Sequence, residues 1–166
     1  MARKVVANAA TNLVPTTLEL GGKSPTIISA DADLTLAAKR IMFVKTLNAG
    51  QICLSPDYIM IKKGLEEKLI SELQQVFKSF YPESNTKDYT SMVNDHHHQR
   101  MHEYLQDAKE KGAKIHNLGE FDSNENNIMT TKVLLNVNDN MRVMQEEIFG
   151  PLLPVMVYEE LSEVVD

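Results

Sequence analysis

The sequence predicts an α/β fold with a mainly parallel sheet flanked by helices. Short apolar runs alternate along the chain with amphipathic stretches of about 15 residues, which is the pattern of βαβ units. The chain has 166 residues, 43% of them apolar, which is enough for one domain with a real core. No internal repeat and no proline- or glycine-rich linker divides it.

The first elements lead into a glycine pair. Lys4 to Asn12 has the alanine and valine content of a helix end, and Pro15 interrupts it. Thr16 to Leu20 is predicted to form a short strand. Gly21-Gly22 then frees the backbone for a sharp turn. The apolar run from Pro25 to Ser29 predicts a buried strand.

The next helix ends just before the only cysteine of the chain. Asp31 or Asp33 can cap its start, and apolar residues follow at helical spacing, with the stem of Lys45 on the same face. Gly50 provides a stop signal. Cys53 is therefore expected on a loop just after a helix, ahead of a strand at Asp57 to Lys62.

The remaining elements are predicted from apolar residues at helical spacing and from short apolar or alternating runs typical of strands. We expect a strongly amphipathic helix over 65–80, a helix over 101–108 that stops at Gly112, and a further helix starting near Leu161. Further strands are expected at 113–115, 133–137 and 152–158, and polar loops at 82–88 and 122–127.

Composition excludes several classes of protein. The formal charge is −6 and the basic residues are scattered, which argues against a nucleic-acid surface. No apolar run approaches the roughly 20 residues that span a bilayer, and Met1 to Lys4 lacks the apolar stretch of a secretory signal. A single cysteine fits a reducing compartment. These observations predict a cytoplasmic protein with no membrane partner.

Cys53 has two interpretations, an inert buried thiol or a nucleophile. For a lone cysteine taken by itself, the buried thiol is the commoner case. The loop position favours the nucleophile, since Gly50 lets the backbone approach a substrate and N–H groups beside Cys53 could donate to an oxyanion. Thiolate also leaves well from a thioester.

Glu19, Glu147 and Phe149 each have two interpretations. Glu19, at an apolar strand end, is either a water-facing residue or a general base whose pKa is raised in a partly apolar cleft. Glu147 is either half of a solvated acidic pair or a carboxylate that holds ribose hydroxyls. Phe149, ahead of Gly150-Pro151, is either a plug in a turn or a ring that packs on a nicotinamide.

The histidines carry a weaker signal. His98 and His102 are four residues apart and could share a helix face that binds metal. No Glu or Cys at ligand spacing completes such a site. An exposed polar helix start is the favoured interpretation, so no metal site is expected.

Three stretches together resemble the aldehyde dehydrogenase superfamily: Leu18 to Pro25, Gly50 to Cys53 and Gln145 to Pro151. The resemblance implies that Cys53 is the catalytic thiol and Glu19 the general base. It also implies that Glu147 contacts the nicotinamide ribose and Phe149 the nicotinamide ring, with Leu20 as a further cofactor contact. The implied reaction is oxidation of a small-molecule aldehyde to its acid through a cysteine thiohemiacetal and thioester, with NAD or NADP as acceptor.

Within that family, the closest resemblance is to the branch of coniferyl aldehyde dehydrogenases. It rests on Asn48 to Cys53, Pro56 to Tyr58, Asp88 to Ser91 and Asp107 to Ala113. Coniferyl aldehyde, or another aromatic or hydrophobic aldehyde, is therefore the expected substrate.

The resemblance also implies a domain division. Residues 1–22 match a remnant of the cofactor-binding domain, and residues 23–166 match a catalytic domain truncated at its C-terminal end. The parent enzyme is expected to be a homodimer or homotetramer, and this chain alone to have little or no dehydrogenase activity. Two alternatives are a cofactor-independent thiol esterase and a non-catalytic domain that retains the fold.

Overall fold

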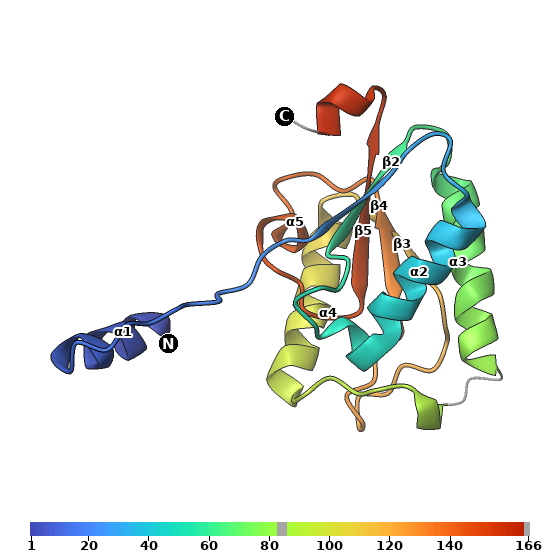
Figure 1. Ribbon diagram of the computed structural model, residues 1–166. Helices are drawn as coiled ribbons and strands as arrows, with labels where there is room; N and C mark the ends of the chain where they lie inside the picture. Colours follow the sequence, from blue (N-terminus) through green and yellow to red (C-terminus); the bar gives the residue numbers. More distant parts are fainter. Residues whose placement is uncertain (83–85, 165–166) are drawn as a thin grey trace.

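The computed structural model describes residues 1–82 and 86–164 of the chain. Its centre is a five-stranded sheet in the order β1-β2-β5-β4-β3 (Figure 1). The first four strands in that order are mutually parallel, and only β3 runs antiparallel to its neighbour β4. The predicted mainly parallel sheet is thus confirmed. The strands are β1 (Pro25–Ile28), β2 (Tyr58–Lys62), β3 (Lys114–Asn117), β4 (Lys132–Leu135) and β5 (Leu152–Tyr158).

Helices cover both sides of this sheet. Figure 1 shows α2 and α3 packed together on one side and α4 on the other. The helices are α1 (Ala2–Thr11), α2 (Leu34–Thr46), α3 (Glu66–Phe80), α4 (Asp95–Glu110) and the short α5 (Arg142–Gln145). Single 3₁₀ turns lie at Leu47–Gly50, Thr86–Asp88 and Leu161–Val164. Within the described ranges, no helix is long and apolar enough to cross a membrane.

The N-terminal part of the chain lies away from this body. Helix α1 buries none of its residues, and an extended segment leads from it to β1 (Figure 1). The prediction of a strand at Thr16 to Leu20 is wrong. A strand needs a neighbour that pairs with its backbone, and none of the described strands lies beside these residues, all of which are exposed.

The sequence signals around α2 are confirmed. The side chain of Asp33 accepts a hydrogen bond from the Leu36 N–H at 3.1 Å, so Asp33 is the cap. After Thr46 the chain reverses through three successive left-handed residues, Asn48, Ala49 and Gly50, with φ of 52°, 54° and 74°. This reversal leaves Cys53 on an exposed turn, as predicted.

The core lies on both faces of the sheet. Ile59 and Ile61 of β2 are fully buried between partly exposed neighbours, as the alternating pattern predicts. The predicted stripe of the 65–80 helix is buried as well, including Leu69, Leu73 and Phe77.

Two further expectations need correction, and one element was missed. Helix α4 begins at Asp95, capped by Asn94, and its His98 is buried with 6% exposure rather than part of an exposed helix start. The chain forms a 3₁₀ turn at Leu161–Val164 instead of a longer helix within the described residues. Helix α5 was not predicted, because four residues are too few to show a helical period.

Candidate active site

The loop that carries Cys53 is held at both ends. The Gln51 side chain donates to the carbonyls of Asn48 at 2.9 Å and Ser91 at 3.2 Å, and it accepts from the Val93 N–H at 2.9 Å. At the other end the Ser24 hydroxyl donates to the Cys53 carbonyl at 3.3 Å. The thiol itself is exposed. The loop is therefore fixed by the side chains of Gln51 and Ser24, while Cys53 remains exposed.

Gly50 brings this loop against the turn before β5. A Cβ placed on Gly50 would stand 2.5 Å from the carbonyl oxygen of Gly150, so the two backbones are in direct contact. Gly150 directly follows Phe149, whose ring is partly exposed and whose backbone is left-handed, with φ of 49°. Two of the three motifs thus meet through glycines.

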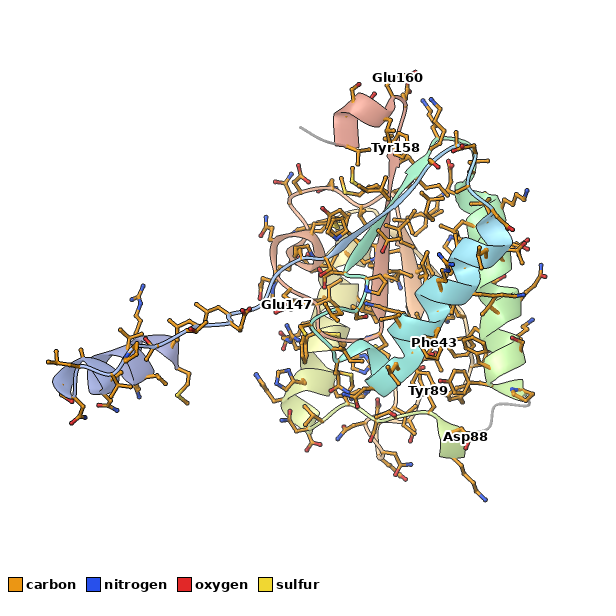
Figure 2. All side chains as sticks on the ribbon, viewed as in Figure 1. Phe43, Asp88, Tyr89, Glu147, Tyr158 and Glu160 are labelled. Carbon is orange, nitrogen blue, oxygen red and sulfur yellow. The ribbon has the colours of Figure 1, made fainter. Side chains whose placement is uncertain are left out.

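The third motif reaches the same turn through Gly21 and Lys23. A Cβ on Gly21 would collide with the carboxylate of Glu147, and Figure 2 shows Glu147 beside the extended segment that leads to β1. The Lys23 ammonium donates to the carbonyls of Val143 and Glu146, each at 3.0 Å, and forms an ion pair with Asp57.

The buried Asp57 contacts both Lys23 and the turn before β5. It is buried with 4% exposure, and its second carboxylate oxygen accepts from the Ile148 N–H at 2.9 Å. Lys45 lies fully buried nearby and donates to the Pro56 carbonyl at 2.8 Å. Burial lowers the pKa of Lys45 to about 7, while the Asp57 carboxylate opposes that lowering. Asp57, together with Lys23 and Lys45, therefore supports both the Cys53 loop and the turn before β5.

Glu19 and Leu20 are not brought to this cluster. Both lie in the extended segment, exposed, and no described residue contacts their side chains through a hydrogen bond or ion pair. The partly apolar cleft expected around Glu19 is not formed by the described residues, because they place no element over it. Glu147, by contrast, is half-buried at the turn.

The histidine pair remains separate from the site. The rings of His98 and His102 lie 4.7 Å apart on α4. Burial lowers the pKa of His98, and His102 adds to the lowering. Among the residues that the structure describes, no group of three His, Cys, Asp or Glu side chains could hold a metal ion.

Sequence reasoning missed the roles of Asp57 and Arg100. Asp57 directly precedes a buried strand, and a buried carboxylate requires a partner, so its position was a usable signal. Arg100 donates to the carbonyls of Glu147 and Ile148, far away in the sequence. Nothing in the local pattern of α4 points to those contacts.

Comparison with known proteins shows the family of this chain. The model of the aldehyde dehydrogenase family matches residues 1–166, so the chain belongs to that family. A probable coniferyl aldehyde dehydrogenase from Pseudomonas aeruginosa is 46% identical over 164 residues, which cover 98% of this chain and 34% of the relative. The chain thus spans about a third of the length of that relative.

Solved structures show the same fold. AldH from Staphylococcus aureus, in a substrate-bound state, matches with a TM-score of 0.89 and 36% identity, over 99% of this chain and 35% of that one. Betaine aldehyde dehydrogenase from Staphylococcus aureus, in complex with NAD⁺, matches with a TM-score of 0.83 and 27% identity, over 99% and 34%. The α/β fold is that of the aldehyde dehydrogenases.

Proposed function

We propose that this chain supplies the nucleophile of an NAD(P)-dependent aldehyde oxidation. One observation carries the proposal: the only thiol of the chain is exposed on a loop whose Gly50 touches the turn that presents Glu147 and Phe149. The loop of the thiol and the turn of the carboxylate and the ring, which are far apart in the sequence, are therefore in backbone contact.

In this proposal the Cys53 sulfur attacks the carbonyl carbon of an aldehyde and forms a thiohemiacetal. The developing oxyanion needs hydrogen-bond donors. The backbone N–H groups of Cys53 and Leu54 donate no hydrogen bond to any described residue, which leaves both available for that oxygen. After oxidation the acyl group remains on Cys53 as a thioester.

Glu147 and Phe149 have the chemistry that a nicotinamide cofactor requires. An ionised carboxylate is a pure acceptor and suits the two hydroxyls of a ribose. Phe149 is 39% exposed and offers a ring face for the nicotinamide, and Leu20, 72% exposed, would add apolar surface once its segment turns toward the site. When bound, the cofactor would accept the hydride that the thiohemiacetal carbon releases.

Glu19 is proposed as the base that takes a proton from the water that hydrolyses the thioester. Glu19 is two residues before Gly21, which lies against the Glu147 carboxylate. The role requires the segment of Glu19 to turn toward Cys53.

An aromatic or hydrophobic aldehyde, such as coniferyl aldehyde, is the proposed substrate. Leu54, beside the thiol, is 79% exposed, and the partly exposed Phe149 ring lies on the adjoining turn. These apolar side chains suit an aromatic group, and the relative from Pseudomonas aeruginosa is named for coniferyl aldehyde. We propose that the full enzyme is a cytoplasmic homodimer or homotetramer, with residues 1–22 belonging to the cofactor-binding domain and 23–166 to the catalytic domain.

Hydrolysis of a p-nitrophenyl ester tests the nucleophile and the base without cofactor. Cys53→Ala should lower turnover by about 100-fold or more. Glu19→Gln should slow steady turnover while leaving the first release of nitrophenol intact, since the base acts on the thioester. Glu67→Gln, at an exposed position on α3, is the control. Unchanged turnover in Cys53→Ala would refute the proposal.

A further inference from the structure

We propose that Arg100 is a positioning residue, which fixes the turn carrying Glu147 and Phe149 over the Cys53 loop. The inference rests on the proposed function and deepens it, because it assigns the geometry of that site to a side chain on α4. Arg100 lies outside all three motifs that predicted the family.

The guanidinium of Arg100 binds two successive carbonyls of this turn. Nη1 donates to the Glu147 oxygen at 3.1 Å, and Nη2 donates to the Ile148 oxygen at 2.7 Å. Two parallel donors fix a direction as well as a distance, which the point charge of a lysine does not. The peptide plane on each side of Ile148 is thereby oriented.

Packing holds the guanidinium in this pose. It stacks on the fully buried Tyr104 with its carbon 5.3 Å from the ring centroid, and Nη1 also donates to the Tyr104 hydroxyl at 3.1 Å. That hydroxyl donates in turn to Glu146 at 2.9 Å, one residue before the turn. Nε of Arg100 is buried with no partner among the described residues.

The next residue of α4 supports the same turn. A Cβ on Gly150 would stand 2.5 Å from the Met101 sulfur, so Met101 lies against one side of Gly150 while Gly50 touches its carbonyl. Phe149, the residue before Gly150, holds a left-handed backbone, which is unfavourable for an L-residue. Such a conformation persists only where its surroundings impose it. Arg100 is the polar part of that support.

Arg142 provides a matched control. Its guanidinium also stacks on Tyr104, with its carbon 5.1 Å from the ring centroid. Its side chain pairs with Glu103 and Glu146, each at 3.5 Å, and makes no hydrogen bond with the carbonyls of Glu147 or Ile148. Arg100 and Arg142 therefore differ in their contacts with the turn.

The test compares Arg100→Gln, Arg100→Lys and Arg142→Gln in the 166-residue chain. Hydrogen exchange of the Ile148 amide, which donates to Asp57, is read by NMR and reports the turn, and the rate of iodoacetamide alkylation reports the single thiol. We expect exchange at least about tenfold faster in Arg100→Gln, because two charge-assisted hydrogen bonds are lost. The alkylation rate should change in the same variant. Arg100→Lys should partly restore both, and Arg142→Gln should match the wild type.

Equal exchange in Arg100→Gln and Arg142→Gln would overturn the proposal. So would faster exchange in Arg100→Gln with an unchanged alkylation rate, because the turn would then be uncoupled from Cys53. Should Arg100→Gln fail to fold, Arg100→Lys against Arg142→Lys decides by the same criteria. A wild-type chain whose Cys53 accepts no acyl group from an ester would contradict the proposed function alone, since the exchange comparison would still decide the role of Arg100.

Discussion

Gly50 joins the Cys53 loop to the turn before β5, and no other residue type fits there. Its φ of 74° is left-handed, and an added Cβ would press on the backbone oxygen of Gly150, which cannot swing aside as a side chain can. The sequence predicted this glycine as a helix stop. Its close contact with Gly150 could not be predicted, because the two residues are brought together only by the sheet.

Gly50→Ala should lower the free energy of unfolding by about 2–4 kcal/mol, since backbone strain and a clash add. Gly64→Ala is the control: its φ is 91°, yet no atom lies within 4 Å of the added Cβ, so only about 1 kcal/mol should be lost. Urea denaturation measures both. Equal losses would show that the contact with Gly150 is not tight.

Lys45 makes stability depend on pH. Its pKa in the folded chain is about 7, well below its ordinary value of 10.5, so between these values the unfolded chain binds more protons. The free energy of unfolding should therefore rise with pH across this window, by about 1 kcal/mol per pH unit from this group, and level off outside it.

Lys45→Met should remove that rise, which denaturation at a series of pH values from 7 to 10 would detect. The variant also loses the hydrogen bond to the Pro56 carbonyl, which lowers the free energy of unfolding by an amount that does not depend on pH. Lys68→Met, at an exposed position on α3, should keep the slope of the wild type. If the free energy of unfolding of Lys45→Met rose with pH as steeply as that of the wild type, the buried amine of Lys45 would not be the source of the rise.

Helix α1 and the segment after it have no part in the folded core. All residues from 11 to 20 are exposed, and the first links to the body are the contact of Gly21 with Glu147 and the ion pair of Lys23 with Asp57. Periodicity predicted α2, α3 and β2 well, because each buries one face in a core made by this chain, and the continuous apolar run of β5 matches a strand whose first four residues are all buried. It failed at Thr16 to Leu20, where strand character needs a neighbour that the described residues do not provide.

Deletion of residues 1–12 should leave the thermal midpoint within about 1 °C of the wild type, because no buried contact is removed. Deletion of residues 1–23 should lower it clearly, since Asp57 would then be buried without its lysine partner. Differential scanning calorimetry of both chains makes the comparison. Equal midpoints for the two deletions would argue against a structural role for Lys23.

The molecule as a whole places the motifs at one end of its parallel strands. The Cys53 loop precedes β2, the Lys23 segment precedes β1, and the Glu147–Phe149 turn precedes β5, three strands that are neighbours in the sheet. Chemistry-bearing segments from positions more than a hundred residues apart thus converge because their strands pair. The motifs were readable in the sequence, and the position of Asp57 carried a usable signal, whereas the contacts by which Asp57, Lys45 and Arg100 support the motifs were visible only in the fold.

The purified chain should form little or no NADH from aldehyde and NAD⁺. It spans 34% of the length of its relative from Pseudomonas aeruginosa, and Glu147, Phe149 and Leu20 are the only cofactor contacts we propose for it. Absorbance at the NADH band measures this, with a complete aldehyde dehydrogenase as positive control. Sustained NADH formation that Cys53→Ala abolishes would show that these contacts suffice.

The most direct test is to ask where an acyl group attaches. The chain is incubated with p-nitrophenyl acetate and quenched early, and intact-mass and peptide mass spectrometry locate the added acetyl group. We predict a single acetyl on Cys53 in the wild type and none in Cys53→Ala, with Glu19→Gln retaining the adduct for longer. Acetylation confined to lysines, and equal in the wild type and Cys53→Ala, would contradict the assignment of Cys53 as nucleophile.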